Sequence, residues 1–196
     1  MQVLHADDRL VVIAKPAGLL SVPGRSEPDC ASARVQAIYP DALIVHRLDQ
    51  ATSGLLLFAR GITAQRELSA DFAARRVGKR YVAIVAGQLE GEGLIDLPLC
   101  ADWPNRPRQQ VDLEHGKPSQ TRWRVLAHEG GHTRVALVPL TGRSHQLRVH
   151  LAHLGHAILG DALYAAPNVA AASPRLLLHA SELQVGGHHF IYPPDF

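Results

Sequence analysis

The sequence predicts an α+β protein with a mixed, mostly antiparallel sheet flanked by helices and loops. Segments typical of strands outnumber helical patterns. The two types do not alternate as they would in a parallel α/β fold. The segment 55–59 is apolar throughout, which predicts a strand buried on both faces. No stretch has the composition of a linker, so we expect one domain spanning residues 1–196.

The composition favours a folded protein and points weakly towards nucleic acid. The 196 residues are 46% hydrophobic and 19% charged, as in globular domains. Seventeen of the 20 basic residues are Arg, whose planar guanidinium binds phosphate and stacks on bases. A genome rich in Arg codons explains the same count equally well. We expect a cytoplasmic protein, because the chain shows no signal peptide and no apolar run approaching the roughly 20 residues of a membrane helix.

The first half of the chain contains one strand-like and two helical segments besides the buried strand at 55–59. Residues 10–14 predict a short strand that ends at the turn Lys15-Pro16-Ala17-Gly18. A short helix is predicted at residues 31–39, and it ends there because Pro40 cannot continue it. Residues 63–75 predict a longer helix, with Leu68 and Phe72 four residues apart on one face.

The second half contains most of the predicted strands. Residues 101–117 are polar and rich in Pro and Arg, which predicts a loop or an exposed hairpin. A further hairpin is expected at 121–127 and 133–138, joined through Gly130 and Gly131. The remaining predicted strands are 81–86, 94–97, 176–178 with 182–185, and a short edge at 190–192.

One helix is expected in the second half, at residues 145–154. Ser144 precedes it and has the side chain of an N-cap residue. Leu147, Leu151 and Leu154 are spaced to form its buried stripe.

Asp49 is the leading candidate for chemistry, because it ends the charged segment 46–49, which a turn of small residues joins to the buried strand. A loop at the mouth of such a strand holds an acid in place and excludes water, as a carboxylate nucleophile requires. Burial alone raises the pKa of a carboxyl group, so a cation must keep it ionised, and Arg47 and Arg148 are candidates. A structural Asp–Arg pair, or an Asp that caps a turn, has the same spacing.

Three further motifs each allow two interpretations. Tyr81 directly follows Lys79 and Arg80, so its ring either stacks on a base or belongs to the core. Histidines spaced three apart at 150–156 lack any further metal-ligand motif, so we interpret them as surface or supporting residues. A polar cluster at the helix N-terminus is either an anion site or a solvated face. It comprises Arg143, His145, Gln146 and Arg148.

Several motifs together resemble one family. The segment 46–55, HRLDQATSGL, is similar to the signature of the RluA family of pseudouridine synthases. The resemblance continues, in the family's order, across nearly the whole chain. Its further blocks are Lys15–Gly18, Lys79–Tyr81, Gly142–Arg148, Gly155–Asp161 and Arg175–Ala180. Residues 16–25 and 100–107 are similar to the subgroup that modifies both tRNA and rRNA.

The resemblance implies a reaction and a catalytic set. The N1–C1′ bond of a uridine breaks, the base turns, and C5 joins C1′, without cofactor or metal. Asp49 matches the catalytic aspartate and Arg148 the arginine that pairs with it. Tyr81 matches the tyrosine that stacks on the target base, and Arg47 the arginine that enters the RNA stem when the uridine flips out. Attack at C1′, addition at C6 and a glycal intermediate all remain open.

The resemblance also implies an RNA partner and its contacts. The expected substrates are the tRNA anticodon stem-loop, at uridine 32, and a 23S rRNA stem-loop, at uridine 746. We expect a monomer without membrane contact and without the S4-like RNA-binding domain of several relatives. The residues expected to bind RNA are Arg47, His46, Arg143, His145, Gln146, Lys79, Arg80, Arg106 and Arg108.

Three alternative functions compete with this interpretation. One is the same chemistry on another rRNA or tRNA uridine, because loop contacts change substrates while a catalytic set persists. Another is a non-catalytic RNA-binding module, against which the presence of Asp49, Tyr81 and Arg148 speaks. The third is a histidine-site metallohydrolase.

Overall fold

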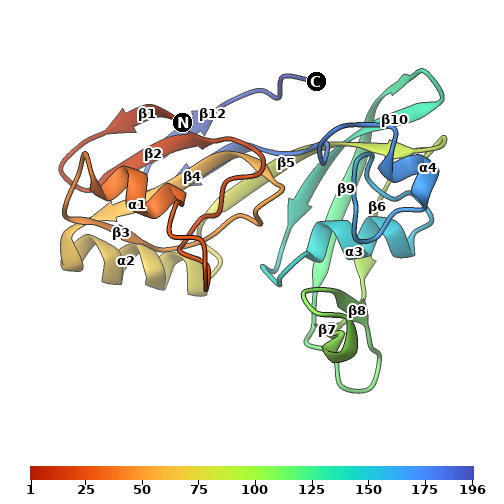
Figure 1. Ribbon diagram of the computed structural model, residues 1–196, viewed down its shortest axis with the longest axis horizontal. Coiled ribbons are helices and arrows are strands. Elements are labelled where there is room, and N and C mark those ends of the chain that lie inside the picture. Colours follow the sequence, from red (N-terminus) through yellow and green to blue (C-terminus); the bar gives the residue numbers. More distant parts are fainter. The chain divides into compact units, whose positions relative to one another are not determined.

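The computed structural model describes residues 1–196 and divides into two compact units (Figure 1). Unit 1 comprises Met1–Lys79 and His179–Asp195, and unit 2 comprises Arg80–Leu178 with Phe196. The chain passes between the units within two strands, β5 (Gly78–Ala86) and β11 (Leu178–Val185).

The sheet of unit 1 is built on two buried central strands, β2 (Leu10–Lys15) and β4 (Ser53–Arg60). They pair antiparallel, and β1 (Gln2–Ala6) adds antiparallel to β2. On β4 the short β3 (Ala42–Ile44) pairs antiparallel, whereas β11 pairs parallel. β12 (His188–Ile191) completes a hairpin with β11. The predicted burial of 55–59 is confirmed, since these side chains are between 0% and 2% exposed.

Two helices belong to unit 1. α2 (Gly61–Ala73) packs Leu68 into the main apolar cluster, against the β4 side chains Leu55 and Leu57, and Phe72 lies beside that cluster. α1 (Ala31–Gln36) is shorter than expected, and its N-cap is Cys30, whose sulfur accepts a hydrogen bond from the Ala33 N–H. Figure 1 shows α2 running along β3 and β4.

The sheet of unit 2 has the order β5–β10–β9–β6 and is antiparallel throughout. Its members besides β5 are β6 (Glu92–Asp96), β9 (Gln120–Glu129) and β10 (His132–Pro139). Gly130 and Gly131 both have positive φ in the predicted turn between β9 and β10. A separate hairpin consists of β7 (Leu99–Ala101) and β8 (Gln109–Val111), with the 3₁₀ helix Trp103–Asn105 between them.

α3 (Gln146–His153) confirms the predicted helix in unit 2 but not its ends. The N-cap is His145, in the left-handed region at φ 54°, and not Ser144. Leu147 and Leu151 are buried, but Leu154 follows the last helical residue and is 39% exposed. His150 takes the buried position instead, at the i+3 spacing from Leu147. The short α4 (Pro167–Ala170) follows, and none of the helices is both long and apolar enough to cross a membrane.

Gly54 fixes the start of β4 next to β11. Its φ is +112°, and a Cβ built on it would lie 2.3 Å from the carbonyl oxygen of Ala180. Only glycine permits this approach, which allows the parallel pairing of Ser53 with His179 and Gly54 with Ala180.

The strand pairings of the two units together give an α+β fold with a mixed, mostly antiparallel sheet, as the sequence predicts.

Candidate active site

The loop that carries Asp49 joins β3 to β4 in unit 1. Asp49 itself is half-buried, and its carbonyl oxygen accepts a hydrogen bond of 3.1 Å from the Thr52 N–H. This turn leads directly into Ser53, the first residue of the buried strand. The backbone of Asp49 is therefore held at the end of a rigid strand.

The loop is fixed on both sides of Arg47. The Ser21 hydroxyl donates to the Leu48 carbonyl at 2.7 Å and accepts from the Leu48 N–H at 3.1 Å. On the other side, the Leu57 N–H donates to Nε2 of His46 at 3.0 Å. Arg47 lies between these two anchors and is exposed. The backbone is thus held while the long Arg47 side chain reaches solvent.

His46 has a structural environment. Its ring stacks on Phe72, with centroids 4.6 Å apart. Burial and then the charge of Lys79 lower the pKa of His46 to about 3. The imidazole is therefore neutral at physiological pH and keeps the lone pair that accepts from Leu57. These contacts place His46 within the fold of unit 1, while its binding to RNA stays a prediction.

Lys15 is a buried cation near Asp49 that the sequence did not single out as a site residue. Only 1% of it is exposed. Its ammonium group donates to the carbonyl oxygens of Pro16 at 2.9 Å, Leu19 at 2.7 Å and Gln50 at 3.0 Å. Burial lowers the pKa of Lys15 to about 8, and the negative charge of Asp49 opposes this shift. Lys15 thus supplies a cation near Asp49 within unit 1, where the sequence suggested arginine.

We expect Lys15→Met to lower the free energy of unfolding by about 3 kcal/mol, because buried carbonyls would lose a charged donor. Urea denaturation measures this change, and pseudouridine formation should fall with it. Lys117→Met is the matched control, since Lys117 is exposed. An equal loss in the two variants would contradict the assigned role of Lys15.

The pH dependence of stability provides a separate test of Lys15. Its pKa is about 8 in the folded protein, against an ordinary value of 10.5. Between these values the unfolded chain binds more protons at this group than the folded chain, so its titration makes stability rise with pH. We expect the difference in unfolding free energy between wild type and Lys15→Met to grow across this window. A constant difference would show that Lys15 keeps its ordinary pKa.

The side chain of His179 joins the start of β4 to the C-terminal segment of unit 1. Nδ1 of His179 lies 2.9 Å from the Ser53 hydroxyl, and its Nε2 lies 2.9 Å from the carbonyl oxygen of Tyr192. His179 is 3% exposed. The strand that follows the Asp49 loop is thereby tied to the final segment of unit 1.

The remaining predicted catalytic residues belong to unit 2. Tyr81 lies near the start of β5, half-buried and paired with Leu137 of β10. Just before it, Arg80 is exposed, and burial lowers the pKa of Lys79. Tyr81 therefore sits on the first strand in the order of the unit 2 sheet, hydrogen-bonded to β10.

Arg148 on α3 makes a buried, two-pronged ion pair with Asp161. Its Nε donates to Oδ2 at 2.8 Å and its Nη2 to Oδ1 at 2.6 Å, with the side chains 5% and 1% exposed. Oδ1 also accepts the N–H groups of Leu163 and Tyr164. The guanidinium lies 5.0 Å from the ring centre of Tyr164. Asp161 thus fixes the direction of Arg148, a role that sequence reasoning missed.

His145 is connected to the same network through Tyr164. The Tyr164 hydroxyl accepts a hydrogen bond from the Gln109 N–H at 2.8 Å. It lies 2.6 Å from Nδ1 of His145, so the hydroxyl and the imidazole share a hydrogen bond. The left-handed backbone at His145 is held in place by this bond.

Gln146 is a structural node at the start of α3. Its Oε1 accepts from the Thr141 hydroxyl and the Arg143 N–H, and its Nε2 donates to Gln120 and Thr121. The side chain is 3% exposed, so it joins the turn before α3 to strand β9. The Arg143 side chain is exposed, and only one contact, to Pro118 at 3.4 Å, is seen within unit 2.

Arg106 and Arg108 lie on the β7–β8 hairpin and are exposed. Arg106 covers the ring of Trp103 at 4.1 Å, and Trp103 is 66% exposed. Arg108 lies 5.5 Å from the ring centre of Tyr164. The hairpin thus presents cations and an aromatic surface to solvent.

The predicted catalytic residues fall on different units. Asp49 belongs to unit 1, and Tyr81 and Arg148 belong to unit 2, so the pairing of Asp49 with Arg148 stays a prediction. The histidine-site hypothesis, which rests on His150, His153 and His156, loses its first ligand. His150 is fully buried, with Nδ1 2.9 Å from Thr121 Oγ1 and Nε2 3.0 Å from the Leu97 carbonyl.

Comparison with known proteins gives the family. The family model described as RNA pseudouridylate synthase matches residues 9–153, most of the chain. The chain is an RNA pseudouridine synthase of this family. The synthase is 53% identical over 187 residues to the dual-specificity RNA pseudouridine synthase RluA of Escherichia coli (strain K12), covering 93% of this chain and 85% of that protein. It is 50% identical over 200 residues to the protein of the same name from Yersinia pestis, covering 100% and 97%.

A solved structure extends the similarity of the synthase to the fold. Human RNA Pseudouridylate Synthase Domain Containing 1 matches with a TM-score of 0.88 at 26% identity, covering 100% of this chain and 84% of that one. The family predicted from the sequence motifs is confirmed.

Proposed function

We propose that this synthase modifies a uridine in two RNAs, the tRNA anticodon stem-loop at uridine 32 and a 23S rRNA stem-loop at uridine 746. The observation that carries the proposal is the similarity to proteins named as dual-specificity enzymes, which extends over nearly the full length of both chains. Substrate preference can change with loop contacts while the catalytic residues stay the same. The similarity to the Yersinia pestis protein covers the whole of this chain, loops included.

Asp49 is the proposed nucleophile. A nucleophilic carboxylate must be aimed at its target, and the anchors at Leu48 and His46 hold the backbone of the Asp49 loop. The Lys15 ammonium is close enough to interact with the Asp49 charge, which supports the assignment. In the reaction the N1–C1′ bond breaks, a C5–C1′ bond forms, C5 releases its hydrogen as a proton and N1 gains a proton. Attack of Asp49 at C1′, its addition at C6 and a glycal route all satisfy this balance.

Arg47 and Tyr81 have complementary roles in extracting the uridine. A base inside a stem is inaccessible, and flipping it out costs a few kcal/mol. We propose that the exposed Arg47 enters the stem and replaces the lost stacking, while Tyr81 stacks on the extracted base. Arg148, oriented by Asp161, is proposed to hold Asp49 ionised and aimed.

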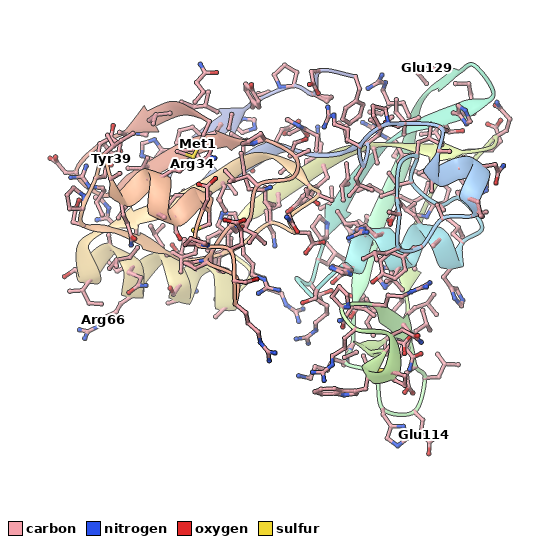
Figure 2. All side chains as sticks on the ribbon, viewed as in Figure 1. Met1, Arg34, Tyr39, Arg66, Glu114 and Glu129 are labelled. Carbon is pink, nitrogen blue, oxygen red and sulfur yellow. The ribbon has the colours of Figure 1, made fainter.

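The RNA backbone is proposed to contact exposed cations. Arg80, Arg106, Arg108 and Arg143 are exposed, and Figure 2 shows Arg66 extending from α2 into solvent. Phosphate contacts of this kind weaken steeply with salt and carry no sequence information. We propose that His145, Lys79, His46 and Gln146 also take part in RNA binding. His46 and Gln146 hold the backbone near Arg47 and Arg143.

We propose that the two units work together as one catalytic domain, in a monomeric enzyme of the cytoplasm. The family model supports the first part, because it runs through both units. Size-exclusion chromatography with light scattering measures the mass of the enzyme in solution. A dimer would overturn the proposed monomer.

Tyr81→Ala is expected to lower kcat/KM about 5- to 150-fold, because stacking of an aromatic side chain on a base contributes about 1–3 kcal/mol. Single-turnover assays on a stem-loop RNA measure the change. Tyr81→Phe keeps the ring, so any loss in that variant reports proton transfer through the hydroxyl. Unchanged turnover in Tyr81→Ala would contradict the stacking role.

Mapping of pseudouridine positions tests the proposed substrates. Unmodified tRNA and a 23S rRNA fragment are incubated with the enzyme, and the modified positions are located by carbodiimide labelling and primer extension. We expect one stop in each RNA, at the proposed uridine, and none when that uridine is replaced by cytidine. Modification at another uridine alone would overturn the substrate proposal while leaving the reaction intact.

A further inference from the structure

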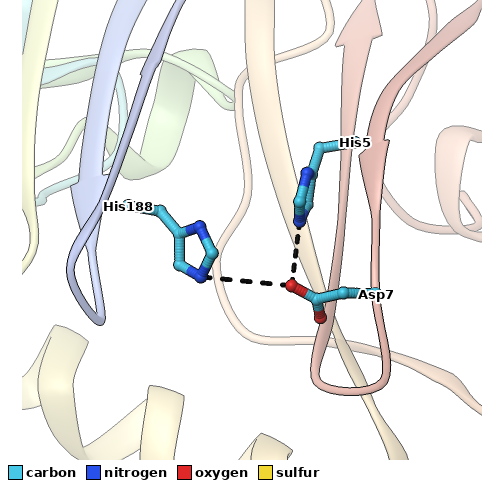
Figure 3. Close-up of side chains that lie close together, drawn as sticks. All are labelled: His5, Asp7 and His188. Atoms are coloured by element: carbon cyan, nitrogen blue, oxygen red, sulfur yellow. Dashed lines mark hydrogen bonds and ion pairs between the residues drawn. The ribbon is translucent and has the colours of Figure 1, made fainter.

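Three side chains of unit 1 meet at the ends of two hairpins (Figure 3). His5 is on β1, Asp7 is in the β1–β2 turn, and His188 is the first residue of β12. Asp7 Oδ2 lies 2.8 Å from Nε2 of His5 and 4.0 Å from Nε2 of His188. His5 and Asp7 are two residues apart, which places both on one side of an extended chain. The chain thus brings together residues 183 positions apart in sequence.

The Asp7 carboxylate is held so that one oxygen faces both rings. Its Oδ1 accepts the N–H groups of Arg9 at 2.7 Å and Leu10 at 2.8 Å. The hydrogen bond from His5 lowers the pKa of Asp7 to about 2. Outer hydrogen bonds of this kind orient a ligand oxygen before a metal arrives.

Both imidazoles are held against the same aromatic ring. The centroid of Phe190 lies 5.2 Å from that of His5 and 5.6 Å from that of His188. The His5 and His188 rings are 5.4 Å apart. This packing limits the positions of two nitrogen ligands that come from different hairpins.

The distances suit a small divalent cation. Zn²⁺ binds imidazole nitrogen and carboxylate oxygen at about 2.0–2.2 Å, so tetrahedral ligand atoms are about 3.4 Å apart. The separations of 2.8 Å and 4.0 Å lie on either side of this value, and the three ligand atoms lie within 4.8 Å of one another. The three side chains are about one-third to two-fifths exposed, so small rotations suffice to equalise the distances.

We propose that His5, Asp7 and His188 form a Zn²⁺ site that ties the β1–β2 hairpin to the β11–β12 hairpin. Two imidazole nitrogens and a carboxylate oxygen are ligands that zinc prefers, and water would complete the tetrahedron. Zinc binding at Nε2 of His5 requires the proton on this nitrogen to leave it, to Nδ1 of the same ring or to solvent. The site takes no part in the isomerisation, which agrees with the expectation that catalysis needs no metal.

Calorimetric titration of the tag-free protein with ZnCl₂, in a buffer that does not bind metal, tests the site. We expect one tight equivalent and a rise in the Tm of the protein. His5→Ala and His188→Ala should each weaken the binding at least about tenfold, because each removes one of three protein ligands. His189→Ala is the matched control: it neighbours His188 on β12, but its ring lies 3.3 Å from Glu182. This variant should bind zinc as the wild type does.

The Tm of each variant with zinc is compared with the Tm of the same variant without metal, which separates zinc binding from any change in stability. His5→Gln repeats the test with a side chain of similar size. Absence of stoichiometric zinc binding by the wild type would overturn the proposal. Binding that survives both His5→Ala and His188→Ala would overturn it as well, because the metal would then use other residues. Tritium release from labelled RNA should be the same with and without EDTA, which keeps this test independent of the catalytic proposal.

Discussion

Asp49→Asn is expected to abolish pseudouridine formation while RNA binding remains near its wild-type level. The substitution replaces a carboxylate by a neutral amide of the same shape, so the loop anchored at His46 and Leu48 keeps its hydrogen bonds. Removal of a nucleophile costs at least about 10³-fold in turnover. Single-turnover kinetics measures the loss, and filter binding measures the affinity for RNA.

Asp41→Asn is the matched control for this substitution. Asp41 is an exposed carboxylate of unit 1 that pairs with Arg60 at 2.7 Å. We expect this variant to retain wild-type turnover. Turnover within tenfold of wild type in Asp49→Asn would contradict the nucleophile assignment, and loss of both turnover and binding would indicate a structural role for Asp49.

Asp161→Asn has the second-largest expected effect. The pair of Asp161 with Arg148 is almost fully buried, and removal of one partner leaves the guanidinium charge uncompensated. Such a change costs about 3–5 kcal/mol in the free energy of unfolding. We also expect kcat to fall at least about 100-fold, because an arginine that loses its orientation no longer positions its proposed partner, Asp49. Urea denaturation and single-turnover assays measure the two effects.

The control for the buried pair is an exposed pair of the same type. Arg34 and Asp29 form an ion pair on the surface of unit 1, and Asp29→Asn should cost less than about 1 kcal/mol. Arg148→Lys provides a second comparison, since lysine carries the charge without the planar fork. Wild-type turnover in Asp161→Asn at a temperature where it is folded would refute the positioning role.

The sequence predicts the parts of the fold that depend on local patterns. The buried strand β4, the β9–β10 hairpin through Gly130 and Gly131, and α3 all follow from periodicity and turn residues. Local patterns misplace the ends of α3, because His145 adopts a left-handed backbone supported by Tyr164, 19 residues later in the chain. No side-chain periodicity around Ser144 reveals that contact.

The same distinction applies to the site. Asp49, Arg148 and Tyr81 lie in motifs that a resemblance identifies, whereas Lys15 and Asp161 acquire their roles from contacts distant in sequence. The Lys15 ammonium reaches a carbonyl of the Asp49 loop 35 residues away, and Asp161 reaches Arg148 across 13 residues. The sequence offered one sign of each role: Lys15 is a charged residue at the end of the apolar strand β2, and Asp161 directly follows Gly160. Both lie in segments that the resemblance already covers.

Tritium release from RNA labelled at C5 of uridine tests the central claim most directly. C5 loses its hydrogen only when the base is rejoined to the sugar through that carbon. We predict release from both the tRNA anticodon stem-loop and the 23S rRNA stem-loop, limited to one equivalent per RNA. Absence of release from either RNA, despite tight binding of both, would contradict the proposed function on these substrates.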